Sequence, residues 1–467
     1  MRKILLVPYV LAALGGSVWL LAQDINVGVS KEAGNRPRIA LPDLRGAGDA
    51  QTFMGAFNQT LQGDIRNSGF LTVVASSWYP KSVPQQVSDW RTPPLPAQTP
   101  RSRRGEMVTA PDGGGFWMAD WSRPPVSAVY MAFGYTAVQN GVLVLYGNLF
   151  DLTRPNTTDA QMISKRYLAP SSDDKGARDL AHQFAADILA LFGAQSLAGT
   201  HIYYVHQASR MTPKEIWVMD FDGRNQRQIT HFNSLTIQPS VSPDGSKIAF
   251  TSYTKGQPRI FVFSTDPVRD LRFYNQIASM NGQPSFTPDG KQIVYSSSAG
   301  VCCRIFLANL DGTGFQAVTS PGSIDAEPKV NPKTGQTILF SSGRSGPEQI
   351  YLMSLNGTDI ERLTDGTGEA SNPAWSPDGQ HVAFAWTRGY AQGKFNVFIM
   401  DVGSRQYVQL THDEGRNENP TFAPGGTHLA FMSTRNGREQ IYSMLADGSG
   451  VQALTSQGYN YSPVWGK

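Results

Sequence analysis

Short runs of alternating apolar and polar residues follow one another through the second half of the chain, and the same turn interrupts each of them. "PSVSPDGSKIAF" starts at residue 239, "PSFTPDGKQIVY" at 284 and "PAWSPDGQHVAF" at 373. Alternation with β-branched and aromatic residues predicts strands. The Pro-Asp-Gly between them predicts a tight turn, because Pro presets φ and Gly accepts a positive φ. Third and fourth runs follow, such as "NVFIMDV" and "YVQLT", so each copy predicts four antiparallel strands.

The copies recur at a nearly constant spacing. The Pro that opens each copy occurs six times, 43 to 47 residues apart, at Pro239, Pro284, Pro328, Pro373, Pro420 and Pro463. Four strands in that period are typical of a β-propeller blade. The sixth copy stops at "SPVWGK", whereas "HIYYV" at 201–205 and the run after it supply the strands that the sixth copy lacks. We therefore predict a six-bladed propeller over about residues 199–467, closed by the C-terminal strand; an open stack of sheets is the alternative.

A separate α/β domain is predicted ahead of the propeller, over residues 37–195. Strands are expected at 37–44, 70–74, 128–134, 141–151 and 161–169. One helix should be capped by Asp49, carry an apolar stripe and end at Gly69; a second should span 174–192. The apolar stripes of these two helices are Phe53, Phe57, Leu61 and Ile65, and Leu180, Phe184, Ile188 and Leu191. Residues 80–125 are rich in Pro, Gly and Arg and predict a long irregular loop.

The first 23 residues, "MRKILLVPYVLAALGGSVWLLAQ", resemble a secretory leader, with two basic residues before an apolar run. Cleavage is expected near Ala22 or Gln23, which leaves a mature chain starting near Asp24 and a flexible segment over 24–36. The alternative is an uncleaved anchor, because Ile4 to Ala22 could span a bilayer. The rest of the chain is then expected to be exported and to contain no membrane span.

Composition excludes some classes of function. The net charge is +3 with mixed signs, and the one small basic cluster lies at 101–104. That is too little for a nucleic-acid surface. The two cysteines, Cys302 and Cys303, are adjacent on an expected third strand. We interpret them as small buried residues; a vicinal redox switch is the alternative.

A search for chemistry finds no catalytic constellation. A serine hydrolase needs a Gly-x-Ser-x-Gly elbow, and the nearest sequence is "SGRSGP" at 342–347. Metal ligands are not clustered: His381 and His428 align with Lys247 at an expected solvent-facing position. His231 and His412, in loops between blades, leave one alternative metal site. We predict no catalytic, metal or cofactor site.

The loops between blades should line the mouth of the central channel. The residue before each opening Pro is polar: Gln238, Gln283, Glu327, Asn372, Asn419 and Ser462. These residues either bond to the strand or the adjacent blade, or form a ring that receives a partner. Five acids fall nearby in adjacent blades and predict an acidic arc that would steer a cationic partner segment, with Glu327 and Glu418 as its principal members. The arc consists of Asp325, Glu327, Glu369, Glu414 and Glu418.

A leader, a short mature segment, an α/β domain and a propeller of "PxWSPDG" repeats together resemble the TolB family. "LQGDIRNSGFLTVV" is similar to the family's helix-then-strand "DLRNSG", and "NPAWSPDG" to its blade openings. The long loop at 80–125 is longer than the family's. The order of domains makes the resemblance specific, since peptidase propellers share the repeat alone.

The resemblance implies a non-enzymatic periplasmic component of the Tol–Pal envelope system. In that family the protein links inner-membrane TolA to the lipoprotein Pal and supports outer-membrane invagination at division and outer-membrane integrity. Pal docks at the channel mouth, and the mature N-terminal segment serves TolA; bacteriocin import exploits the same surface. Here that segment begins Asp24, Ile25, Asn26 and Val27. A monomer is expected, and the alternative is a periplasmic propeller hydrolase or lyase with an unrecognised active site.

Overall fold

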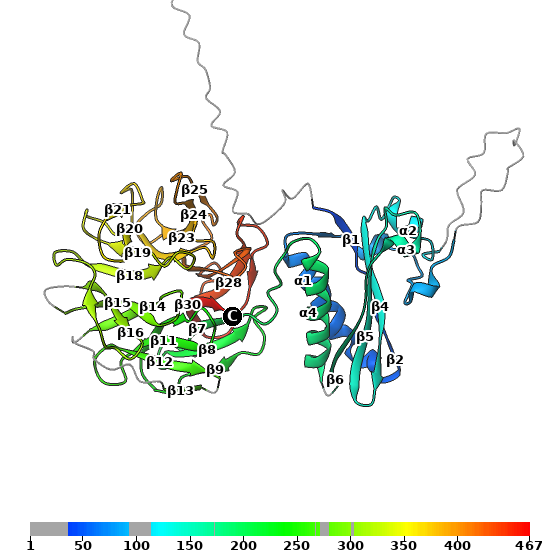
Figure 1. The fold of residues 1–467 in the computed structure, drawn as a ribbon, viewed down its shortest axis with the longest axis horizontal. Helices are drawn as coiled ribbons and strands as arrows, with labels where there is room; N and C mark the ends of the chain where they lie inside the picture. The colour runs from blue at the N-terminus through cyan, green and yellow to red at the C-terminus, as the bar shows by residue number, and fades with distance from the viewer. Residues whose placement is uncertain (1–35, 93–113, 172, 267, 271–279, 300–302) are drawn as a thin grey trace, which may run out of the picture.

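The computed structural model describes residues 36–92, 114–171, 173–266, 268–270, 280–299 and 303–467. An N-terminal α/β domain lies beside a ring of six small sheets (Figure 1). The expected leader, the basic cluster at 101–104 and most of the segment 24–36 lie outside the described residues.

One mixed sheet forms the centre of the N-terminal domain. Its order is β3-β1-β4-β5-β6, with β2 also paired to β4. The long β4–β5 hairpin turns through Asn140 and Gly141, which both have positive φ, as the two-residue turns that suit twisted strands require. The strands are β1 (Arg38–Ala40), β2 (Arg45–Ala47), β3 (Thr72–Val73), β4 (Tyr130–Gln139), β5 (Val142–Asp151) and β6 (Gln161–Pro170).

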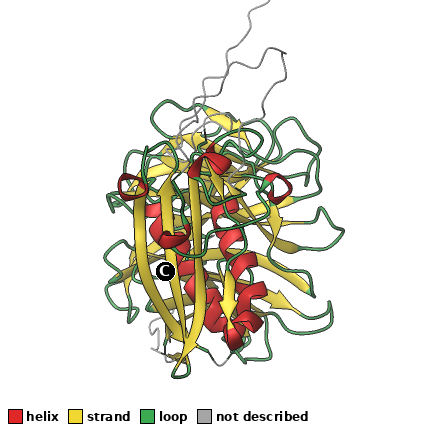
Figure 2. Cartoon of the chain, turned by 90° about the vertical axis from the view of Figure 1, so that its right-hand side faces the viewer, coloured by secondary structure: helices red, strands yellow, loops and turns green. Residues whose placement is uncertain are grey.

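Helices α1 (Met54–Asn67) and α4 (Asp174–Ala190) cover one face of this sheet. Seen from the side of the domain, the long strands stand in front of these helices (Figure 2). The apolar stripes pack as predicted, with Phe57 and Phe184 fully buried. Two details were wrong. A 3-10 turn leads into α1 and no side chain caps it, so Asp49 is not a cap, and Leu191 lies past α4 and is exposed.

The opposite face is covered by the segment that was expected to be an irregular loop. It contains α2 (Met118–Ser122), and α3 (Thr157–Ala160) adds to the same layer. Trp121 is fully buried and its indole N–H donates to the carbonyl of Gly115 at 2.8 Å. Trp90 lies against Phe133 and Phe150, with ring centroids 5.5 and 5.9 Å apart. The described parts of 80–125 therefore form a second core layer.

Each propeller blade is a four-stranded antiparallel sheet. The first five, in chain order, are β10 (Thr236–Val241) to β13 (Val268–Asp270), β14 (Asn281–Phe286) to β17 (Gln316–Ala317), β18 (Asp325–Val330) to β21 (Glu361–Arg362), β22 (Ala370–Trp375) to β25 (Tyr407–Gln409), and β26 (Asn417–Phe422) to β29 (Gln452–Ala453). The fourth strand of the first of these blades is the three-residue β13.

The last blade joins both ends of the propeller sequence, as predicted. Strand β30 (Tyr459–Gly466) pairs with β7 (His201–Gln207), followed by β8 (Glu215–Asp220) and β9 (Arg227–Gln228). Trp465 packs in one cluster with Ile202 and Tyr204, and its indole N–H donates to the hydroxyl of Thr200 at 2.9 Å. The ring is thus closed by a strand-to-strand seam.

A small set of polar contacts joins the two domains where α1 ends beside the fifth blade. The imidazole Nε2 of His428 donates to the carbonyl of Asn67 at 2.8 Å, and the Asn67 amide donates to Gln452 at 3.1 Å. Arg36 and Asp447 form an ion pair at 3.3 Å. His428 was expected to face solvent, but the N-terminal domain covers it and it is only 5% exposed.

Candidate functional site

The six polar residues that precede the opening prolines share an unusual backbone. All six have φ between 46° and 56°, in the left-handed region: Gln238, Gln283, Glu327, Asn372, Asn419 and Ser462. Each one lies where the first strand of its blade bulges. Such a conformation costs a non-glycine residue about 1–3 kcal/mol and persists only where its surroundings impose it. The strand is therefore bent in the same way six times around the channel.

Hydrogen bonds between neighbouring blades impose this bend. The side chain of one bulge residue accepts from the backbone N–H of the next: Gln238 from Gln283 at 3.3 Å, and Gln283 from Glu327 at 3.0 Å. Glu327 in turn accepts from Asn372 at 2.6 Å, and Asn372 from Asn419 at 3.3 Å. These bonds agree with the interpretation that the residues bond to the adjacent blade. They form a belt around the inner ends of five blades, which we call the bulge belt.

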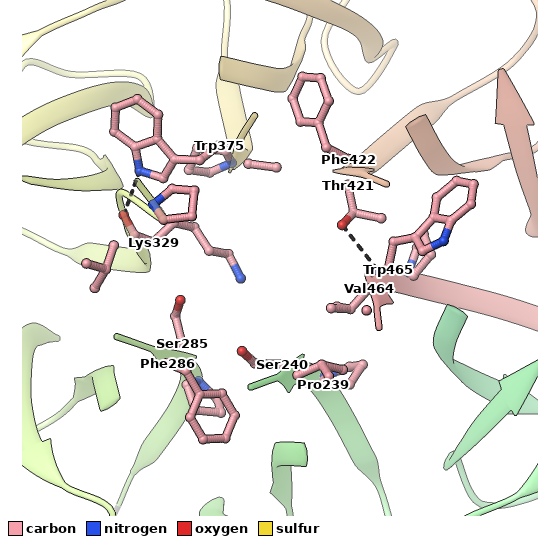
Figure 3. A pocket seen from close by; sticks show the side chains of 18 of the residues that line it. Pro239, Ser240, Ser285, Phe286, Lys329, Trp375, Thr421, Phe422, Val464 and Trp465 are labelled. Atoms are coloured by element: carbon pink, nitrogen blue, oxygen red, sulfur yellow. Dashed lines mark hydrogen bonds between the residues drawn. The ribbon is translucent and has the colours of Figure 1, made fainter. Parts of the chain in front are cut away.

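The bulge belt surrounds a channel of about 470 Å³, lined by the first strands of all six blades. Apolar residues two positions after the opening Pro pack between neighbouring blades. Trp375, for example, packs on Leu339 of the preceding blade and donates its indole N–H to the carbonyl of Lys329 at 3.0 Å (Figure 3). These contacts leave the centre of the ring open.

The residue directly after each opening Pro faces the centre of the channel. Figure 3 shows the side chain of Lys329 reaching into that space, with the hydroxyls of Ser240 and Ser285 turned toward the same region. Burial lowers the pKa of Lys329, and the negative charge of Glu327 offsets this effect in part. Glu327 does not pair with the ammonium; both of its oxygens bind Asn372, at 2.6 Å to the N–H and 2.7 Å to the side-chain amide.

The acidic arc expected at the mouth is smaller than the sequence suggested. Asp325 is fully buried: its Oδ1 accepts from the Ser342 hydroxyl at 2.6 Å and from Arg344 at 2.9 Å. Asp325 is the first residue of β18, and its side chain points toward Ser342 of the neighbouring strand β19 (Thr337–Ser342) rather than toward the rim. Asp325 therefore does not belong to an exposed arc.

Two of the other acids at the mouth, Glu414 and Glu418, lie beside arginines. Glu418 is half-buried beside Arg416 at 3.4 Å, and burial raises its pKa. Glu414 is exposed and pairs with Arg435 at 3.1 Å. Glu369 accepts from the amide of Gln392 at 3.1 Å. The rim is therefore a mixed set of charges, and of the five acids in the expected arc only Glu414 is exposed.

Several other sequence predictions can be placed in the structure. No three His, Cys, Asp or Glu side chains in the described parts of the chain are arranged to hold a metal ion. His381 was expected at the surface but is 5% exposed, since its cross-strand neighbour Asp401 and the nearby Asp378 enclose it. Cys303 precedes β16 (Arg304–Asn309) rather than lying on it.

Two further predictions concern membranes and the N-terminal segment. In the part of the chain that the structure describes, no helix is long and apolar enough to cross a membrane. Asp24, Ile25, Asn26 and Val27 lie outside the described residues, so their assignment to a partner stays a prediction.

The fold and the channel define a closed six-bladed β-propeller that carries an α/β domain at its side. The family model described as the TolB beta propeller domain matches residues 189–371 and 364–467, more than half of the chain. The chain belongs to the TolB β-propeller family, which confirms the resemblance seen in the sequence.

Individual relatives agree with this family. A protein TolB homolog of Chlorobium chlorochromatii is 30% identical over 264 residues, 56% of this chain and 47% of the relative. The Tol-Pal system protein TolB of Bordetella pertussis is 37% identical over 193 residues, 41% of this chain and 43% of the relative. The matches thus span less than half the length of these curated relatives. The crystal structure of TolB from Acinetobacter baumannii shares the fold, with a TM-score of 0.71 over 94% of this chain and 97% of that chain, at 21% identity.

Proposed function

We propose that this chain is a non-enzymatic, periplasmic component of a Tol–Pal system. In this proposal the propeller channel receives a Pal-like lipoprotein and the N-terminal segment 24–35 binds a TolA-like inner-membrane protein. The chain would thereby connect the two membranes and support outer-membrane invagination during division and outer-membrane integrity. The leader-like residues 1–23 support the periplasmic location.

The observation that carries this proposal is the open channel in a propeller of the TolB family. A channel of about 470 Å³ lies within the range of pockets that enclose a small ligand or an inserted side chain. The bulge belt holds its rim in place without filling it. A preformed rim lowers the ordering cost of binding, which suits docking of a folded partner.

Titration of a Pal-like domain and a TolA-like domain against the purified protein tests the proposal. We expect saturable binding of both. Removing Asp24 to Asn35 should abolish TolA binding and leave Pal binding unchanged. Absence of Pal binding to the intact chain, in the presence of a correctly melting propeller, contradicts the proposal.

The contribution of rim charge needs variants that spare the bulge belt. Glu327 is unsuitable for charge reversal because it holds Asn372, and Glu418 is half-buried against Arg416. Glu369→Arg combined with Glu414→Arg instead changes two rim acids that do not belong to the bulge belt. Asp266→Arg with Asp311→Arg is a matched control, since both acids are exposed in turns between third and fourth strands.

If the rim acids steer a cationic partner, the first pair of changes should slow association of the Pal-like domain. Added salt should reduce this difference in association rate, because exposed charges are screened within about 8 Å at physiological ionic strength. The control pair should bind like the unchanged protein. Equal association rates for all three proteins would show that the rim acids are only solvated charges.

A further inference from the structure

The centre of the channel carries a positive charge that its surroundings leave unpaired. No described residue forms an ion pair or hydrogen bond with the ammonium of Lys329. The nearby carboxylate of Glu327 is engaged at both oxygens by Asn372. Burial disfavours the charged form of this half-buried lysine, so a bound anion would stabilise its ammonium.

Hydroxyl groups surround the same space. Ser240 and Ser285 follow the opening prolines of the two preceding blades, and both are almost completely buried, at 7% and 8% exposed. Figure 3 shows both hydroxyls turned toward the region that Lys329 enters. An ammonium and two hydroxyl donors that face one space match the acceptor oxygens of a carboxylate.

We propose that the channel binds a protein segment that inserts an aspartate or glutamate side chain, with Lys329 as its cationic partner and Ser240 and Ser285 as hydrogen-bond donors. This inference rests on the proposed docking of a partner at the channel and names the chemistry of the group that enters it. The acidic rim alone would favour a cationic segment, whereas Lys329 at the centre of the channel favours an anionic one.

The charge beside the site favours a protein segment over a free anion. Glu327 lines the same channel as Lys329, and its negative charge disfavours a small free anion there. A peptide segment also contacts the channel walls through its backbone, so it can hold one carboxylate beside Lys329 despite the charge of Glu327. The limited volume of the channel suits a loop tip rather than a folded domain.

Two probes test the site. The first is a flexible Gly/Ser peptide with one central aspartate, compared with its asparagine counterpart, followed by NMR of the lysine ammonium groups. We expect the aspartate peptide to shift the Lys329 signal and the asparagine peptide to leave it unchanged. Lys329→Met should abolish the response, Lys329→Arg should keep binding of the aspartate peptide, and Lys333→Met, at an exposed lysine of the same blade, should behave like the unchanged protein.

The second probe is the Pal-like domain. Lys329→Met should weaken its binding by about 30-fold or more, because a buried carboxylate loses its partner. Melting curves of the variants check that the ring is intact; loss of one unpaired charge should not lower the melting temperature.

The outcomes separate this inference from the proposed function. If the Pal-like domain binds equally well to the unchanged protein and to Lys329→Met, the inference is wrong and the proposed function stands. If Pal does not bind at all but the aspartate peptide shifts Lys329, the proposed function is wrong and the carboxylate site stands. An equal response to the aspartate and asparagine peptides overturns the site directly.

Discussion

The propeller and the N-terminal domain bury the faces of their sheets in different ways. Each propeller blade buries its faces against two neighbours, and the bulge belt and the β30–β7 pairing make the ring continuous. The N-terminal sheet stands alone, with a helical layer on one face and the Trp121 layer on the other. Stability in the ring is therefore shared and depends on closure, whereas stability in the N-terminal domain depends on two local cores.

Breaking the closure should have the largest effect. Deleting residues 458–467 removes β30, exposes the edge of β7 and leaves the channel incomplete. We expect aggregation or a much lower melting temperature, monitored by light scattering and circular dichroism. Trp465→Ala is the milder form and should cost about 3–5 kcal/mol. An unchanged melting curve for the deletion contradicts closure by β30.

A core change in the N-terminal domain should act locally. Phe184 is fully buried between α4 and the sheet, and Phe184→Ala should cost about 3–5 kcal/mol. Calorimetry should show the N-terminal transition moving down while the propeller transition stays in place. If both transitions move together, the two domains unfold as one unit and the contrast between shared and local stability fails.

Cutting one link of the bulge belt should have a smaller effect on the ring. Glu327→Ala removes both acceptors of Asn372, at a cost of about 1–3 kcal/mol in the stability of the propeller. Glu327→Gln is the matched control, since it keeps an amide oxygen as acceptor, and it should recover part of the loss. Denaturant unfolding measures both variants; equal stability of Glu327→Ala and the unchanged protein would mean that the belt adds nothing.

The contact between the domains should depend weakly on pH. Burial lowers the pKa of His428, so protonation of its imidazole opposes the folded state, although the Nε2–H bond to Asn67 offsets this in part. Its contribution to stability is present above the unfolded pKa of about 6.5 and is lost as pH falls toward the lowered folded pKa. His182 acts in the opposite direction: burial disfavours its charge, but Asp64 at 2.6 Å outweighs burial and raises its pKa.

Melting temperatures between pH 7.5 and 5.5 test this contact. The unchanged protein should lose stability over this window relative to His428→Gln, which keeps an N–H donor for Asn67 but does not titrate. His182 is present in both proteins, so its contribution cancels in the comparison. Parallel pH profiles for the two proteins would exclude a role for His428.

The repeat made the propeller predictable from the sequence. Six copies of one pattern constrain each other, so the blade count and the shared last blade follow from residues such as Pro239 and Pro463. The N-terminal domain has no second copy. Trp121 stands in a Pro- and Gly-rich stretch without periodicity, and its burial depends on a sheet made of distant residues. His428 was misplaced because only the docked domain covers it.

The sequence predicted where the channel lies, but not the backbone conformation or the charge of the residues that line it. Polar residues before each Pro were visible, yet their left-handed backbone was not, since a hydrophobic pattern carries no information on φ. The repeat pattern did not indicate a role for Lys329, because the same position holds Ser, Ala, Thr or Val in the other blades. A repeat shows what its copies share, whereas Lys329 differs from its counterparts.

The seam between β30 and β7 also sets an order of events during synthesis. Thr200 and Trp465, which bond across it, are 265 positions apart, so the blade that is begun first is completed last. Contacts between such distant residues form slowly, and β7 must wait with an open edge until β30 has been made. A chain interrupted before residue 459 cannot hide that edge. The ring therefore distinguishes finished chains from unfinished ones, and unfinished chains remain open to proteases and chaperones.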